Sequence, residues 1–272
     1  MSDAGAPDDA AAQTPRRPFQ PGERALLFDS KGRRYLVTLE SGAEFHTHAG
    51  VVPHDLLLGH DEGTTVRSTR GARYIAVRPT LGEVVLKMPR GAQVIYPKDL
   101  GPALMMADIF PGARVLESGL GSGAMSMALL RAGADVTGYE IRPEFAARAV
   151  QNVTAFLGQP ALSKYHVEVH DIYEGIGHKG LDRVVLDLPE PWRAVKHAAG
   201  ALQPGGILLS YLPTVLQVIT LREALEGAGF AMAETVEILQ RSWHIDGQSV
   251  RPDHRMVGHT GFLTVARLLA LA

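Results

Sequence analysis

The sequence of 272 residues contains no cysteine. Disulfide bonds, thiolate metal ligands and cysteine nucleophiles are therefore excluded, and nothing argues for secretion. Long hydrophobic runs are missing too, since no stretch approaches the roughly 18 apolar residues of a membrane-spanning helix. The N-terminus also lacks the apolar centre of a signal peptide. We therefore expect a cytoplasmic protein with no membrane partner.

A large excess of charge of either sign is also absent. The 27 Lys and Arg residues nearly balance the 29 Asp and Glu residues, which gives a net charge of −2. A nucleic-acid partner would therefore need local basic patches, or patches assembled by oligomerisation. The hydrophobic content of 46% is ample for a packed core, so the chain can form one large domain or one domain with an appendage.

The first 78 residues divide into two parts. Residues 1–22 are rich in Ala, Pro and Asp and have no apolar period, which predicts a disordered tail. Residues 23–78 contain two pairs of short alternating runs separated by turns, which predict a small β-rich domain. Its arginines could face RNA, or they could be solvated residues that protect strand edges: Arg33, Arg34, Arg67, Arg70, Arg73 and Arg78.

Residues 79–272 alternate between strand and helix patterns, which predicts a doubly wound α/β domain. Two final strands, near 232–241 and 261–269, have no helix between them, so one strand of an otherwise parallel sheet should be antiparallel. That ending is typical of methyltransferases that use S-adenosylmethionine (SAM). The preceding strands are expected at 113–117, 135–140, 165–170, 181–187 and 206–211, and the helices at 122–132, 143–157, 190–201 and 213–228.

A glycine-rich loop follows the first of these strands. Gly119, Gly121 and Gly123 alternate before a helical stretch, and such a loop lets a nucleotide-type cofactor approach the backbone. The spacing also satisfies the dinucleotide fingerprint, so NAD stays open. Glu117 favours SAM, because its carboxylate would repel a pyrophosphate but attract the cationic amino group and sulfonium of SAM.

Two further acids end the next strands. Glu140 ends the second strand, where either cofactor presents its ribose hydroxyls. Asp171 ends the third strand, where it could accept from the amino group of the cofactor's adenine. A capping role for Asp171 is an equal alternative.

The fourth strand leads into Asp187-Leu188-Pro189-Glu190-Pro191-Trp192. A carboxylate followed by prolines and an aromatic residue is typical of methyltransferases that act on nitrogen atoms of nucleobases. Asp187 could accept from the amino group of adenine as methylation places positive charge on the ring, and Trp192 could offer a face to the base. The alternative is a helix-capping Asp187 and a core Trp192.

Five stretches combine these motifs: Gln93–Asp99, Leu116–Gly123, Tyr139–Glu140, Asp187–Trp192 and Arg251–Thr260. The combination resembles the TrmI-type tRNA (adenine-58, N1) methyltransferases, particularly those of actinobacteria. The resemblance implies a class I SAM-dependent methyltransferase fold, SAM as donor, adenine 58 in the T loop of tRNA as target, and a homotetramer. It also implies that Asp187 faces the adenine. The implied cofactor-binding residues are Gln93, Tyr96, Glu117, Gly119, Leu120, Gly121, Ser122, Gly123, Glu140 and Asp171.

The segment between the last two strands carries basic residues and should lie near the carboxyl edge of the sheet. It either grips tRNA phosphates or forms a solvated loop. Its candidate tRNA contacts are Arg251, His254, Arg255 and His259. We expect no metal site, because the sequence has no thiolate and no His-Glu-x-x-His spacing.

Three alternative functions remain open from the sequence. Within the same class, the target could be another adenine or another RNA. An NAD-dependent dehydrogenase would need a hydride-transfer His or Tyr-Lys pair, which we cannot place. A catalytically idle RNA-binding paralogue is disfavoured by the intact Glu117, Glu140 and Asp187.

Overall fold

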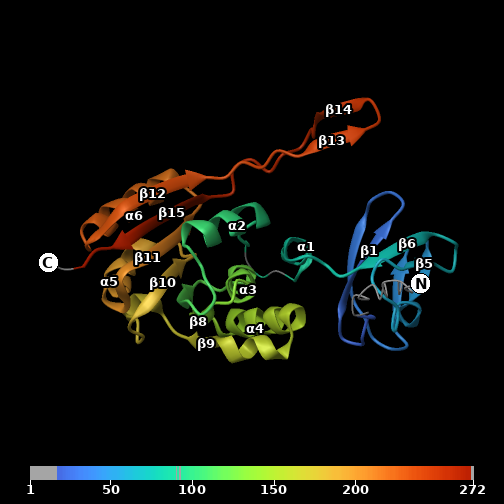
Figure 1. Cartoon of the computed structure of the whole chain (residues 1–272), viewed down its shortest axis with the longest axis horizontal. Helices are drawn as coiled ribbons and strands as arrows, with labels where there is room; N and C mark the ends of the chain where they lie inside the picture. The colour runs from blue at the N-terminus through green and yellow to red at the C-terminus, as the bar shows by residue number, and fades with distance from the viewer. Residues whose placement is uncertain (1–16, 90, 92, 271–272) are drawn as a thin grey trace, which may run out of the picture. The chain divides into compact units, whose positions relative to one another are not determined.

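The computed structural model describes residues 17–89, 91 and 93–270, which form two compact units divided between Pro79 and Thr80 (Figure 1). The division falls one residue beyond the boundary predicted from the sequence. Of the predicted tail, residues 1–16 lie outside the described residues. Phe19, by contrast, is buried, and its N–H donates to the carbonyl of His60 (2.9 Å). The folded part of the N-terminal unit therefore begins before the predicted residue 23.

The N-terminal unit is built from antiparallel strands around a small core. Its main sheet has the order β2-β1-β6-β5, and β3 and β4 form a separate hairpin. The two predicted strand pairs are present, and β3–β4 adds to them. The strands are β1 (Arg24–Asp29), β2 (Arg34–Thr38), β3 (Glu44–Thr47), β4 (Gly50–Pro53), β5 (Thr65–Arg67) and β6 (Arg73–Val77), with the 3₁₀ turn η1 (His54–Leu56) after β4.

The second unit contains a seven-stranded sheet of order β12-β15-β11-β10-β7-β8-β9. β15 runs antiparallel to both of its neighbours, and the other strands are parallel. This mixed sheet confirms the predicted doubly wound fold with an antiparallel ending. The strands are β7 (Arg114–Ser118), β8 (Asp135–Glu140), β9 (Tyr165–Val169), β10 (Leu181–Leu186), β11 (Leu202–Leu212), β12 (Phe230–Glu237) and β15 (Phe262–Leu268).

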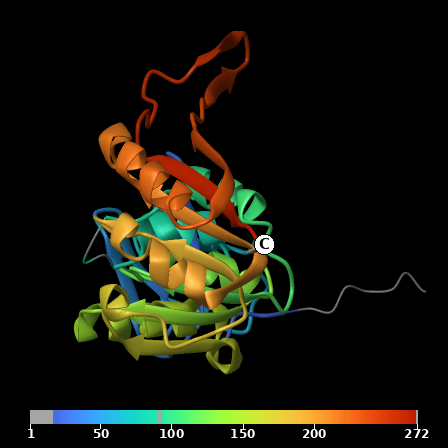
Figure 2. The same cartoon turned by 90° about the vertical axis from the view of Figure 1, so that its left-hand side faces the viewer.

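Helices cover both faces of this sheet (Figures 1 and 2). Successive residues of a strand point to opposite faces, so Val115 joins the core with α2 and α3 while Leu116 joins the core with α5 and α6. Within the described residues, no helix is both long and apolar enough to span a bilayer. The helices are α1 (Leu81–Lys87), α2 (Pro97–Met106), α3 (Ala124–Arg131), α4 (Pro143–Leu157), α5 (Val195–Ala201) and α6 (Val215–Glu226), with 3₁₀ turns η2 (Gln159–Lys164), η3 (Ile172–Glu174) and η4 (Pro191–Arg193).

Several elements differ from the sequence prediction: β11 begins four residues earlier and β12 ends four residues earlier than predicted. The segment predicted as a helix over 190–201 begins at Pro191, because Glu190 precedes a proline and takes a non-helical conformation (φ −133°, ψ 58°), and it is divided at Ala194 into η4 and α5. The link between β12 and β15 contains an extra hairpin, β13 (Trp243–Asp246) and β14 (Ser249–Pro252). This hairpin projects beyond the sheet of its unit (Figures 1 and 2).

Candidate active site

The predicted acids meet at one edge of the parallel sheet. β7, β8 and β10 are neighbours, and ligands of such sheets bind beyond the carboxyl ends of the strands. A cavity of about 560 Å³ opens at this edge. Its lining comes from four strand ends and two loops: Gln93, Val94, Gly119, Gly121, Glu140, Ile141, Arg142, Asp187, Leu188, Pro189, Tyr211, Pro213 and Thr260.

A smaller recess continues the cavity beneath the glycine loop. Glu117, Leu120 and Ser122 line it, together with Gln93 and Asp187. Ser122 is buried, and no described residue is a hydrogen-bond partner of its hydroxyl oxygen. The recess therefore exposes polar groups to whatever occupies the cavity.

The glycine loop takes its shape from left-handed backbone positions. Gly119 has φ 88°, and a Cβ there would collide with the carbonyl oxygen of Asp187. The Asp187 N–H donates to the carbonyl of Ser118 (2.9 Å), so the two loops lie backbone to backbone. Gly121 has φ 51° and open space where a Cβ would stand, which leaves room for a ligand beside the chain. Gly123 follows as the N-cap residue of α3.

Glu117 is buried, and its Oε2 has no hydrogen-bond partner among the described residues. Burial raises the pKa of its carboxyl group to about 8. Hydrogen bonding to Ser126 opposes this rise, and repulsion from Asp187 and Glu140 adds to it. An unpartnered buried carboxylate oxygen is costly unless a ligand completes it. A cationic ligand group would do so.

Asp187 and Glu140 complete a group of three carboxylates. Burial raises the pKa of Asp187 to about 7, and repulsion from Glu140 contributes. Glu140 is fixed by backbone donors, since its Oε2 accepts from Gly121 N (3.2 Å) and its Oε1 from Arg142 N (3.1 Å). Clustered carboxylates of this kind favour a ligand with positive charge and hydroxyl donors, and SAM carries both.

Tyr211 and Thr260 form the wall that the sequence analysis missed. Burial raises the pKa of the Tyr211 phenol to about 12, and a hydrogen bond with Thr260 opposes the rise. Thr260 Oγ1 donates to Asp99 Oδ2 (2.7 Å), and Lys98 Nζ donates to Asp99 Oδ1 (2.8 Å) and to the carbonyl of Ile238 (2.7 Å). The available signal was position, because Tyr211 lies at the carboxyl end of β11.

Asp171, Trp192 and Tyr96 line neither the cavity nor the recess. Asp171 Oδ1 accepts from Tyr173 N (2.9 Å) and caps η3, which is the structural role considered as the alternative. Trp192 lies half-buried on η4 and does not line the cavity. Tyr96 precedes α2 and lines an adjacent cavity together with Arg255.

The predicted tRNA contacts are dispersed along the β12–β15 link. Arg251 lies on β14 in the projecting hairpin, and His254 is exposed beyond it. His259 lies nearer the cavity, since its Nε2 bonds to the carbonyl of Pro213 (2.6 Å). Its Nδ1 bonds to Glu237 Oε1 (2.6 Å), and this hydrogen bond is the main cause of its raised pKa. The expectation that the whole segment lies at the carboxyl edge is thus wrong for Arg251.

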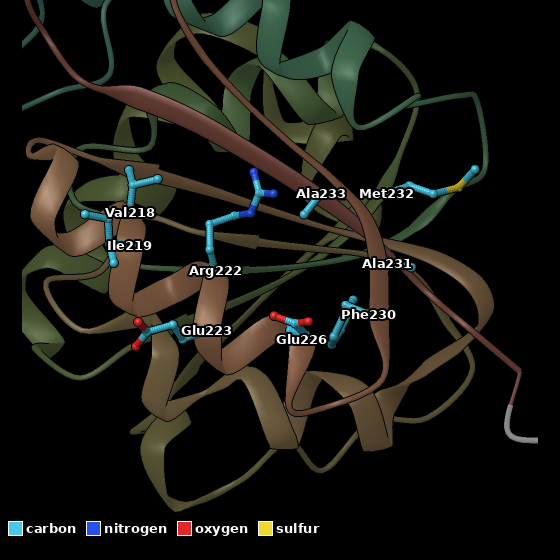
Figure 3. A pocket seen from close by; sticks show the side chains of 9 residues that line it. All are labelled: Val218, Ile219, Arg222, Glu223, Glu226, Phe230, Ala231, Met232 and Ala233. Carbon is cyan, nitrogen blue, oxygen red and sulfur yellow. The ribbon is translucent and has the colours of Figure 1, made fainter.

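A second cavity, of about 540 Å³, lies between α6 and β12 (Figure 3). Its side chains include Arg222, Glu223 and Met232, and none of the predicted site residues lines it. We therefore place the candidate active site at the carboxyl edge. Across residues 17–89, 91 and 93–270, no group of three or more His, Asp or Glu side chains is arranged to hold a metal ion.

The sheet order, the glycine loop and the acids at the strand ends together define a class I SAM-dependent methyltransferase. The chain belongs to the family of the tRNA methyltransferase complex GCD14 subunit, whose model matches residues 73–251. A TrmI-like N-terminal model matches residues 18–66, in agreement with a folded unit that begins before residue 23.

Sequence relatives carry related names. The tRNA (adenine(58)-N(1))-methyltransferase TrmI of Thermus thermophilus is 40% identical over 245 residues, which cover 89% of this chain and 95% of the relative. The tRNA (adenine(57)-N(1)/adenine(58)-N(1))-methyltransferase TrmI of Methanocaldococcus jannaschii is 35% identical over 270 aligned residues, with 89% and 94% covered.

Solved structures resemble the whole chain as well. A Thermotoga maritima protein described as a SAM-dependent O-methyltransferase has a TM-score of 0.88 and 32% identity, with 93% of this chain and 96% of that chain covered. The tRNA (m1A58) methyltransferase TrmI of Aquifex aeolicus has a TM-score of 0.81 and 30% identity, with 94% and 100% covered. These likenesses include both units.

Proposed function

We propose that this chain transfers a methyl group from SAM to N1 of adenine 58 in the T loop of tRNA. The observation that carries the proposal is the position of Asp187, which directly follows β10, lines the cavity and lies backbone to backbone with the glycine loop. Its carboxylate can therefore face a base held beside the cofactor. The relatives from Thermus thermophilus and Methanocaldococcus jannaschii support the choice of adenine, tRNA and N1.

SAM would supply a methyl group bound to a positively charged sulfur. The unpartnered Oε2 of Glu117 would accept from the amino group of SAM, whose positive charge would also favour the ionised carboxylate. Glu140 would bind the ribose hydroxyls, and the backbone from Gly119 to Gly123 would lie against the ligand. Gln93 lines both the cavity and the recess and would therefore contact the bound SAM. Adenine contacts from Asp171, and cofactor contacts from Tyr96, stay predictions.

Asp187 would act on the target adenine. N1 of adenine is already a lone-pair nucleophile, so the reaction needs no strong base at the start. Methylation places positive charge on the ring and its amino group, and a carboxylate that accepts from that amino group stabilises the charge. A pKa of about 7 lets Asp187 be ionised for this purpose and still take the proton afterwards.

The remaining side chains of the cavity wall would pack against the two faces of the target adenine. Leu188 and Pro189 are apolar, and Tyr211 offers an aromatic ring, as a base drawn out of its stack requires. Since Trp192 does not line the cavity, we assign the aromatic face to Tyr211 instead. Contacts of Arg251, His254, Arg255 and His259 with the tRNA phosphates stay part of the proposal.

The direct test is to incubate the protein with labelled SAM and unmodified tRNA and then to map the modified nucleoside. The expected product is N1-methyladenosine at position 58. A second tRNA with guanine at position 58 should stay unlabelled. Label at another adenine, or in another RNA, would favour the alternative target, and reduction of a nicotinamide cofactor without methyl transfer would overturn the assignment.

We also propose that the chain works as a homotetramer in the cytoplasm. An isolated two-stranded hairpin has little stability of its own, yet β13–β14 exposes Trp243 (57%), Ile245 (73%) and Val250 (58%). Exposed apolar surface of this kind supports contact with other copies of the chain. The cytoplasmic assignment is supported by the proposed tRNA substrate.

A further inference from the structure

Three turns of the N-terminal unit meet at one end of its sheet. They are the β1–β2, β3–β4 and β5–β6 turns, and hydrogen bonds connect them. Arg33 Nη2 donates to His48 Nε2 (3.1 Å), and Arg70 Nη1 donates to the carbonyl of His48 (3.3 Å). Thr69 N also donates to the carbonyl of Val51 (2.9 Å). The turns therefore form one continuous surface.

Basic side chains gather on this surface. Six exposed Lys and Arg residues lie on the turns or on the strand residues next to them, and His46 and His48 lie on β3 and its turn. Among the described residues of this region, Asp29 pairs with Arg33, and Glu44 with His46. We call the six cations the turn-end patch: Lys31, Arg33, Arg34, Arg67, Arg70 and Arg73.

Four other acids of the unit lie toward the opposite end. Thr38 pairs with Arg24 at the start of β1, so the chain after β2 lies at that end. Glu23 and Glu62 both bind Arg78. Asp55 accepts from Gly42 N, and Glu40 follows β2. The charges of this unit are thus segregated along its strands, although the charge of the whole chain is nearly balanced.

Three arginines of the patch have oxygen partners that carry no charge. Arg67 donates to the carbonyl of Gly71, Arg70 to that of His48, and Arg73 to Thr65 Oγ1. Within residues 17–89, 91 and 93–270 no carboxylate forms an ion pair with any of them. Arg67 and Arg73 are also direct cross-strand partners, and like charges opposite each other destabilise a sheet. An anion bound between them would remove that repulsion.

We propose that the turn-end patch binds the sugar-phosphate backbone of the tRNA. The inference rests on the proposed function for the identity of the polyanion. Guanidinium groups bind phosphates through paired N–H donors, and phosphate binding at the patch adds affinity that does not depend on base sequence. The patch explains how a chain of net charge −2 holds a polyanion.

The test compares two triple variants of the full chain. R67A/R70A/R73A removes three charges from the patch. The matched control, R131A/K164A/K179A, also removes three charges. These residues lie in the second unit, near the edge of its sheet where the parallel strands begin, which is the edge opposite the candidate active site. tRNA affinity is measured over a salt series by filter binding, SAM affinity by calorimetry, and turnover at saturating tRNA.

The patch variant should bind tRNA about tenfold or more weakly at 0.15 M salt, and its plot of log K against log salt should flatten by about 0.7–0.9 for each phosphate that it no longer neutralises. SAM affinity and turnover at saturating tRNA should match wild type. R67K/R70K/R73K keeps the charge and should keep the slope. The control triple should bind tRNA as wild type does.

An unchanged affinity and slope for the patch variant would overturn the inference, and so would an equal weakening in the control triple. If the triple variant melts early, Arg70→Ala alone decides, with an expected change in slope of about 0.7–0.9. Loss of binding to phosphatidylserine vesicles with intact tRNA binding would assign the patch to a membrane surface and reject the proposal. Because binding is measured apart from methylation, a wild type that binds tRNA through the patch without modifying it rejects the proposed function alone.

Discussion

Single carboxyl groups decide the chemistry of the site. Glu117 is buried and Asp187 is half-buried, and the pKa of each carboxyl group is raised, to about 8 and to about 7. Burial is the larger cause for each, and neighbouring acids add to it. A cation that enters the cavity favours the ionised carboxylates and so lowers the pKa of both groups. The unliganded protein therefore holds protons that SAM should displace.

Glu117 should make the stability of the unliganded protein depend on pH. Its pKa is about 8 in the fold and 4.5 ordinarily, so the folded state binds a proton that the unfolded state has released. The stabilisation is complete below pH 4.5 and is lost as pH rises through 8. Glu117→Gln should flatten urea unfolding measured from pH 5 to 9 and add on the order of 2–5 kcal/mol at pH 9. A wild type of constant stability over this range would contradict the burial of the charge.

Asp187→Ala should separate rate from binding. Turnover on tRNA should fall by about a hundredfold or more, as is usual when one hydrogen-bonding group is removed from a transition state, while SAM affinity stays near wild type. Single-turnover kinetics and calorimetry measure the two quantities. Asp135→Asn is the control, since Asp135 is exposed at the start of β8, where it pairs with Lys164, and the variant should leave turnover intact. If SAM affinity falls as far as the rate, Asp187 belongs to the cofactor site or to folding instead.

At the scale of elements, the sequence predicted what depends on local periodicity. Buried parallel strands appear as apolar runs, so β7, β8, β9 and β10 were located within one residue at each end. The meeting of Glu140 and Asp187 was also predicted, because the carboxyl ends of parallel strands lie at the same edge of a sheet. Tyr211 and Thr260 were missed, since their meeting depends on β15 pairing with β11, which no local pattern reveals.

The missed hairpin β13–β14 had a local signal. Asp246-Gly247 lies between two short alternating runs, and Asp-Gly is among the strongest hairpin turn pairs. Gly247 takes φ 54°, as such a turn requires. Placing Arg251 near Asp187 followed from overlooking that turn.

The Lys98–Asp99–Thr260 chain should position the wall of the base cavity. Thr260→Val removes the hydroxyl between Asp99 and Tyr211 at nearly constant volume. Turnover on tRNA should fall several-fold to about tenfold, and stability by about 1 kcal/mol. SAM affinity should change little. Steady-state kinetics measures the change in turnover, and urea unfolding measures the change in stability.

Thr264→Val supplies the control for that variant. Thr264 is buried on β15, four residues after Thr260, and its hydroxyl bonds to that of Thr235 (2.9 Å). It should lose similar stability and keep full turnover. Equal decreases in turnover in the two variants would show that stability alone explains the result at Thr260.

At the scale of the whole molecule, the hairpin should hold copies of the chain together. W243S/I245S should reduce the mass measured by light scattering from four times 29.3 kDa to a smaller assembly, because serine offers little apolar surface for another copy to bury. Met105→Ser, on the exposed face of α2, is the control and should leave the mass unchanged. A wild type that is monomeric at micromolar concentration would exclude the tetramer.

The close approach of Gly119 to the Asp187 carbonyl, which leaves no room for a side chain, should couple the binding of SAM to the binding of the target adenine. Because the Asp187 N–H donates to the carbonyl of Ser118 beside the glycine loop, a ligand that shifts one of these segments should also shift the other. If bound SAM strengthens adenine binding by ordering Asp187, bound adenine must strengthen SAM binding by the same factor, because linkage between two binding sites is reciprocal. The two substrates should thus bind cooperatively, with the same factor whichever comes first.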